Sequence, residues 1–173
     1  APATRLIVRD GDPARMELAQ GDAYFVVQHD PRRTLSIKVG DYSISDIGTT
    51  FGINLSSDAM TVAVAEGHVS VAPDEGEATR VSAGQQLTAR HQQRSARLTA
   101  VQPGDVGSWR QGRLVYDNAP LSVVAADVAR YSGKTITVDP VIGNRPFSGV
   151  LAIGDGSGLL ANLSNLMAIT YEE

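Results

Sequence analysis

Cysteine is absent from the 173 residues of this chain, and aromatic residues make up only 5% of it. The lack of cysteine excludes thiol nucleophiles, cysteine-ligated zinc and disulfide bonds, although it does not indicate a compartment. No apolar run reaches the roughly 18 residues of a membrane-spanning helix. Basic residues are not in excess, since the formal net charge is -4. This balance argues against non-specific binding to nucleic acid or to an anionic membrane.

Reactive side chains are also few, and they do not converge in the sequence. The three histidines, His29, His68 and His91, lie in separate segments. Asp155 in "GDGSG" lacks the alternating carboxylates of a calcium loop and the lysine of a phosphate loop, and Ser148 in "FSGV" lacks a nucleophile elbow. We therefore predict no catalytic residue, no metal site and no cofactor, and hence a protein that is not an enzyme.

What the chain does contain is typical of a globular protein rich in strands. Hydrophobic residues make up 42%, charged residues 20%, and there are 17 glycines. This mixture favours short strands joined by tight turns. The chain begins at Ala1 without a start methionine or a secretory signal, so we expect an excised fragment or a mature portion.

The first half alternates with a period of two. Leu35, Ile37 and Val39 share one face, and Gly40-Asp41 turns the chain. At Asp46 the alternation slips by one residue, which predicts a β-bulge. Beyond the slip, in "DIGTTFGI", the glycines at 48 and 52 lie opposite the apolar face, where we expect them to admit a neighbouring layer.

Two further glycines, Gly67 after Glu66 and Gly84 after Ala83, predict tight turns between strands, the first of them a β-hairpin turn. No amphipathic helix of useful length interrupts this part. The first half is therefore predicted to be all-β, either a sandwich or a stacked-sheet arrangement.

The segment 101–109, "VQPGDVGSW", is the best candidate boundary because it is rich in proline and glycine. We predict an α+β protein of two domains, 1–103 and 104–173. The second domain is expected to be a strand-helix-strand unit repeated twice (βαβ-βαβ), with helices near 120–132 and 157–167 and strands at 134–139, 145–153 and 168–173. Asn118 and Ser157 are candidate helix caps, and Gly133 is expected to end the first helix.

These residues resemble a known family. The ordered set of Gly21 with Tyr24-Phe25-Val26, Ile47-Gly48-Thr49 with Phe51, Glu66-Gly67 with Val69 and Val71, and Ala83-Gly84-Gln85 resembles the FecR-like periplasmic domain of transmembrane anti-sigma regulators. The second half, from Trp109 to Leu166, resembles the short N-terminal (STN) module of secretins and TonB-dependent transducers. Together the two resemblances cover about residues 18 to 171.

The resemblance implies a role in cell-surface signalling. The chain would be the periplasmic, signal-receiving part of an inner-membrane regulator of iron transport. Its partner would be the N-terminal signalling domain of an outer-membrane TonB-dependent transducer that reports siderophore availability. A cytoplasmic segment and a membrane helix, both absent from this chain, would connect it to a sigma factor.

Open sheet edges in the second half are the predicted partner-binding sites, because an unpaired strand is a template for a partner strand. The strands 134–139 and 168–173 are the candidates, and an internal position for both strands remains the alternative. The predicted contact residues are Lys134, Thr135, Ile136, Thr137, Val138, Ala168, Ile169, Thr170 and Tyr171.

Other functions remain open from the residues alone. The segments 29–34, "HDPRRT", and 90–98, "RHQQRSARL", are solvated connectors or contacts for an acidic partner. A carbohydrate-binding or hydrolytic module of the cell envelope would need aromatics and paired carboxylates around a groove. A secretin-type assembly module would instead associate with copies of itself.

Overall fold

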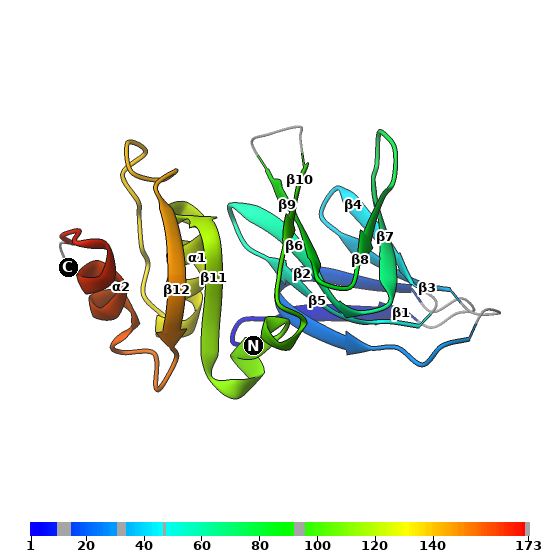
Figure 1. Cartoon of the computed structure of the whole chain (residues 1–173), viewed down its shortest axis with the longest axis horizontal. Coiled ribbons are helices and arrows are strands. Elements are labelled where there is room, and N and C mark those ends of the chain that lie inside the picture. The colour runs from blue at the N-terminus through cyan, green and yellow to red at the C-terminus, as the bar shows by residue number, and fades with distance from the viewer. Residues whose placement is uncertain (10–14, 31–33, 47, 92–95, 172–173) are drawn as a thin grey trace. The chain divides into compact units, whose positions relative to one another are not determined.

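The computed structural model describes residues 1–9, 15–30, 34–46, 48–91 and 96–171, and its chain is drawn in Figure 1. Its contacts divide the chain into two compact units. The first comprises Ala1 and Ala3–Gly107, and the second comprises Pro2 and Ser108–Glu173. The division falls after residue 107, whereas the sequence placed a domain boundary after residue 103.

The first unit is built from ten strands and one short 3-10 helix among its described residues. The strands are β1 (Arg5–Arg9), β2 (Arg15–Val26), β3 (Leu35–Val39), β4 (Tyr42–Asp46), β5 (Thr50–Leu55), β6 (Ala59–Glu66), β7 (His68–Pro73), β8 (Thr79–Ser82), β9 (Gln85–Arg90) and β10 (Ala96–Ala100). The 3-10 helix η1 spans Pro103–Asp105.

All ten strands belong to one hydrogen-bonded sheet that folds upon itself at β2. The strand order is β10-β9-β6-β5-β2-β3-β4-β7-β8, and β1 pairs with β2 (Figure 1). The first part of β2 pairs in parallel with β3, and the part from Gly21 onward pairs antiparallel with β5. Gly21 has a φ of +92°, and a Cβ there would lie 2.6 Å from the Cα of Thr4. Glycine is therefore required where β2 changes partners.

One hydrophobic core joins the two halves of this folded sheet. Its buried residues come from both halves, including Ile37 and Ile44 from one and Phe51 and Val62 from the other. The rings of Phe25 and Phe51 stack with centroids 5.1 Å apart. Alternate residues of β3, β4, β5, β6 and β7 are buried in this core, as the period of two predicts. The predicted stacked-sheet arrangement is thus formed by a single continuous sheet.

The turn at Gly67 corrects one prediction. Gly67 has the expected positive φ, +77°, but β6 and β7 do not form a hairpin, because β6 pairs with β5 and β9 while β7 pairs with β4 and β8. The turn at Ala83-Gly84 behaves in the same way between β8 and β9. Both turns pass the chain from one half of the sheet to the other.

The shift in alternation at Asp46 is not the predicted β-bulge. The chain there passes from one half of the sheet to the other, as it does at Gly67 and Gly84. β4 ends at Asp46 and pairs with β3 and β7, whereas β5 begins at Thr50 and pairs with β2 and β6. Ile47 lies outside the described residues. A Cβ on Gly48 would overlap the backbone of His29, and one on Gly52 would lie 3.5 Å from a methyl group of Val106. Gly48 therefore allows the close approach of His29, whereas a side chain at position 52 would make only an ordinary contact.

Over its described residues, the second unit contains two strands and two α-helices. These are β11 (Arg113–Pro120), α1 (Leu121–Ser132), β12 (Pro146–Ala152) and α2 (Leu159–Met167), preceded by the 3-10 helix η2 (Ser108–Gln111). β11 and β12 form a two-stranded antiparallel sheet, with a register shift between Tyr116 and Ala119. The helices pack against this sheet and bury a core that includes Leu121, Val128, Phe147 and Leu163.

The helix boundaries confirm part of the prediction and correct the rest. Gly133 ends α1 in the left-handed conformation, with a φ of +71°. Asn118 is not a cap, because β11 continues through it to Pro120, which occupies the N-cap position. Ser157 does not cap α2, since Gly158 holds that position. Leu166 lies three residues after Leu163, at the spacing of one helix face, yet it is 62% exposed.

The predicted strands at 134–139 and 168–173 are wrong over their described residues. Residues 134–139 and 169–171 have no regular secondary structure, and Ala168 is the left-handed cap of α2. A strand needs a ladder partner, and neither segment forms a ladder with β11 or β12. Ile136, Val138 and Ile169 instead pack against the core as irregular chain. The described second unit therefore contains strand-helix twice, not a complete βαβ repeat.

Candidate functional site

The predicted contact residues lie in two irregular segments of the second unit. In the first, Lys134, Thr135 and Thr137 are exposed, while Ile136 and Val138 are half-buried against the core. In the second, Ala168, Thr170 and Tyr171 are exposed, and Ile169 is half-buried. The Ser164 hydroxyl donates a hydrogen bond to the carbonyl oxygen of Ile169. Neither segment presents the strand edge that the sequence predicted.

A free strand edge is found instead on β12. Two backbone hydrogen bonds fix its orientation: Ile153 N–H donates to Gly112 O at 2.8 Å, and Leu121 N–H donates to Arg145 O at 2.9 Å. Antiparallel pairing alternates between residues that face the partner strand and residues that face away from it. Residues 147, 149 and 151 of β12 therefore direct their backbone groups to β11, and residues 148, 150 and 152 direct theirs outward.

A groove runs beside this edge. It is lined by six consecutive residues, Arg145 to Val150, together with Leu166 and Met167 from the last turn of α2, and its volume is about 300 Å³. Because consecutive residues of a strand alternate between its faces, a groove that touches all six lies along the strand edge. Its lining combines apolar side chains with a larger share of polar surface.

Gly149 and Leu166 shape this groove in different ways. A Cβ added to Gly149 would lie only 3.0 Å from the Cζ atom of Phe147, so the absence of a side chain leaves space over the Phe147 ring. Leu166 follows Leu159 and Leu163 at helical spacing, yet it is 62% exposed while they are 1% exposed. Leu166 therefore contributes apolar surface to the groove rather than to the core.

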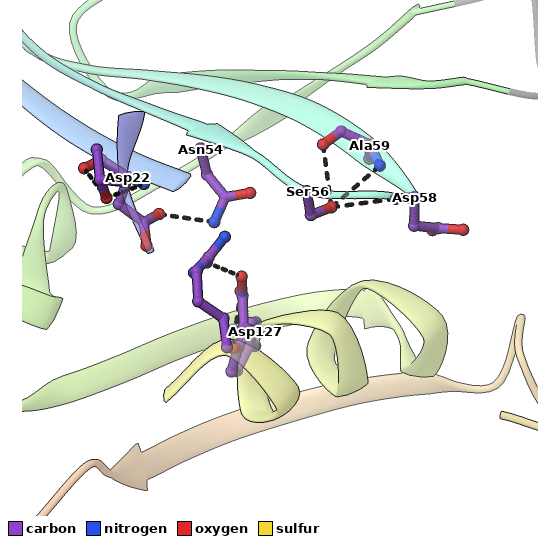
Figure 2. A network of polar contacts seen from close by, with 9 residues as sticks. Asp22, Asn54, Ser56, Asp58, Ala59 and Asp127 are labelled. Atoms are coloured by element: carbon purple, nitrogen blue, oxygen red, sulfur yellow. Dashed lines mark hydrogen bonds and ion pairs between the residues drawn. The ribbon is translucent and has the colours of Figure 1, made fainter. Parts of the chain in front are cut away.

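Polar contacts elsewhere stabilise turns and helices. In the first unit, Asn54 Nδ2 donates to Asp22 Oδ1 at 2.6 Å, and the Ser56 hydroxyl donates to Ala59 O at 3.1 Å while accepting from the N–H groups of Asp58 and Ala59 (Figure 2). In the second unit, Asp127 is ion-paired with Arg130. Asp127 also accepts a hydrogen bond from the Tyr116 hydroxyl at 3.0 Å.

The sequence-selected reactive residues are not brought together. His68 lies at the start of β7, His29 contacts Gly48, and His91 Nε2 lies 2.9 Å from the Ser56 carbonyl oxygen. Within the described ranges, no three histidine, aspartate or glutamate side chains form a group that could hold a metal ion. Of the two basic segments, residues 31–33 and 92–95 lie outside the described residues.

Asp155 is tied into its own loop. Its Oδ1 accepts hydrogen bonds from the Ser157 hydroxyl at 2.7 Å and from the Ser157 N–H at 3.0 Å. Both bonds stabilise the carboxylate and so lower the pKa of Asp155 below its ordinary range, and the bond from the hydroxyl contributes most. The loop is thus a short turn that leads into α2.

The sequence pattern predicted a strand at 145–153, but it did not indicate which edge of that strand would be paired. The free β12 edge was therefore not predicted. One signal was present: residues 146–152, "PFSGVLA", contain no charged side chain. No helix in the described part of the chain is long and apolar enough to cross a membrane.

Comparisons with known proteins bear on both units. In fold, the chain is similar to two crystal structures of a candidate anti-sigma factor from Parabacteroides distasonis ATCC 8503. The first has a TM-score of 0.83 at 20% identity and covers 98% of this chain and 83% of that chain. The second has a TM-score of 0.80 at 21% identity, and the match covers 94% of this chain and 77% of that chain.

At this identity the likeness establishes the fold alone. No curated protein matches the chain in sequence. The resemblance of the second half to an STN module stays a prediction. Residues 1–70, however, match the family model described as FecR protein. The N-terminal 70 residues are thus similar to the FecR protein family.

Proposed function

We propose that this chain is the signal-receiving part of a FecR-like sigma regulator and that it acts in the periplasm by protein recognition rather than by catalysis. The FecR match over residues 1–70 supports the regulator class. The partner that we propose is the N-terminal signalling domain of an outer-membrane TonB-dependent transducer. Through it the chain would relay iron-siderophore availability to a sigma factor.

The observation that carries this proposal is the unpaired β12 edge, with the exposed side chains of Val150 and Leu166 in the groove beside it. Unpaired backbone groups beside apolar surface are suited to recognition of another chain, because main-chain hydrogen bonds supply affinity and side-chain pockets supply specificity. The described residues offer no comparable gathering of acid, base or nucleophile. The irregular segments 134–138 and 168–171 remain proposed partner contacts as well.

Calorimetric titration with the signalling domain of the cognate transducer tests the function. We expect a one-to-one complex with micromolar or tighter affinity. Moderate salt should weaken it little, because backbone pairing and apolar burial are screened less than exposed charges. The signalling domain of a non-cognate transducer is the control. Absence of heat and of co-elution with the cognate domain would contradict the proposal.

A further inference from the structure

We propose that β12 receives an extended strand of a partner protein, with an aliphatic side chain of that strand in the groove and an acidic side chain beside Arg145. This inference rests on the proposed function only in taking the partner to be a protein. It concerns a surface that the sequence did not select. Three independent features of the second unit define the occupant.

The backbone defines it as a strand. Ser148, Val150 and Ala152 direct both their N–H and C=O groups away from β11, and Pro146 adds a carbonyl group. No other strand of the described chain pairs with this edge. A partner strand of about seven residues would match the length of β12, Pro146–Ala152.

The side chains along the edge permit such pairing. Proteins commonly protect free edges with charged residues, which discourage the approach of another strand. The other edge strands carry such charges: Arg5 in β1, Arg80 in β8, Arg97 in β10, and Arg113 and Asp117 in β11. β12, "PFSGVLA", carries none. It is therefore the edge most open to pairing.

The groove defines the side chain that enters. Phe147, Val150, Leu166 and Met167 supply the apolar part of its lining, which is smaller than the polar part. The volume of about 300 Å³ lies at the lower end of the range for binding pockets. Val150 is 52% exposed and Leu166 62% exposed. An aliphatic side chain of the added strand would cover both of them, and the hydrophobic effect would favour that burial.

Arg145 defines the charge of the occupant. It is exposed at the end of the groove, and among the described residues it forms no ion pair. Opposite charge at such a rim increases association rate and selects between partners, whereas like charge is disfavoured. An acidic residue at the matching end of the strand is thus preferred over a basic one.

The probe for the first experiment is the peptide acetyl-EVTVTVE-amide, which carries glutamate at both ends so that either strand direction can meet Arg145. It is titrated into the whole ¹⁵N-labelled chain and followed by NMR. We expect the amide signals of Ser148, Val150 and Ala152 to shift most. The peptide acetyl-KVTVTVK-amide should have an affinity at least about tenfold lower. The peptide acetyl-EVTPTVE-amide lacks a central N–H and should not bind.

Two variants test the same edge from the protein side. Val150→Lys places a charge on the strand and should abolish binding. Arg145→Glu should reverse the preference so that the lysine peptide binds better than the glutamate peptide. Val141→Lys is the matched control, because Val141 is 88% exposed and lies outside the groove. Circular dichroism checks that each variant folds. If Val150→Lys does not fold, the reversed peptide preference of Arg145→Glu still tests the inference.

Several results would overturn the inference. These are shifts confined to another edge such as β1, equal binding of both charged peptides, or no binding of any peptide at millimolar concentration. Self-association of the wild-type chain that Val150→Lys abolishes would make a second copy the occupant and would also overturn it.

The transducer titration separates this inference from the proposed function. A complex with the transducer domain that is insensitive to Val150→Lys and Arg145→Glu would refute the β12 site and leave the function standing. Binding of the acidic peptide at β12 without binding of any transducer domain would refute the function and support the site.

Discussion

The backbone N–H of Ala83 donates a hydrogen bond of 2.9 Å to the carbonyl oxygen of Gly67. Gly67 lies in the turn from β6 to β7, and Ala83 lies in the turn from β8 to β9. At each turn the chain passes from one half of the folded sheet to the other. Gly84 adds a second bond, from its N–H to Val64 O at 2.9 Å. The two passages are therefore held together at one corner of the first unit, which closes the sheet around its core.

Gly67→Ala is expected to destabilise the first unit more than the matched change Gly40→Ala. Both glycines have positive φ, so each substitution carries a backbone cost of about 1–2 kcal/mol. At Gly67 the new Cβ would also lie 2.6 Å from Thr49 Cγ2, whereas at Gly40 nothing lies within 4 Å. Urea unfolding of the two variants measures the difference. Equal losses would show that the corner is not tightly packed.

Leu163→Ala and Leu166→Ala should differ strongly in their effect on stability although both lie on α2. Leu163 is 1% exposed, so its truncation should cost about 2–5 kcal/mol in free energy of unfolding. Leu166 is 62% exposed, and its truncation should cost less than about 1 kcal/mol. Thermal and urea unfolding measure both. A large loss for Leu166→Ala would place that side chain in the core and remove it from the groove.

Amide hydrogen exchange should alternate along β12. The N–H groups of Phe147, Gly149 and Leu151 face β11 and should be protected, whereas those of Ser148, Val150 and Ala152 face outward and should exchange quickly. Exchange followed by NMR on the isolated chain gives this pattern residue by residue. The same measurement with bound acidic peptide should slow the outward set. Uniform protection in the free chain would mean that the edge is already paired.

Ser157→Ala should raise the pKa of Asp155 toward its ordinary range, because it removes the hydroxyl that contributes most to lowering it. Since the pKa is lowered in the folded chain, this contribution to stability is present above the pKa of the unfolded state. It is lost as the pH falls through the folded-state pKa. Carboxyl NMR titration measures the change, with Ser148→Ala as a control that should leave Asp155 unchanged. No shift in Ser157→Ala would contradict the assigned bond.

Local sequence rules determined much of this molecule. Alternation identified the buried faces of β3 and β5, because side chains on a strand alternate whatever its partner. Helical spacing and the left-handed preference of glycine identified α1 and its end at Gly133, since both act within one turn of the helix. The glycines at 67 and 84 were recognised as turns for the same reason.

Pairing between strands was decided only by the tertiary structure. A glycine with positive φ permits the chain to turn, but it does not specify whether the next strand pairs with the preceding one or crosses to the other half of the sheet. Gly67 and Gly84 were therefore predicted to connect paired strands. The segment 134–139 has the composition of a strand, yet no described strand pairs with it. Strand pairing depends on residues far apart in the sequence, and for that reason the free edge of β12 emerged only when the whole chain was folded.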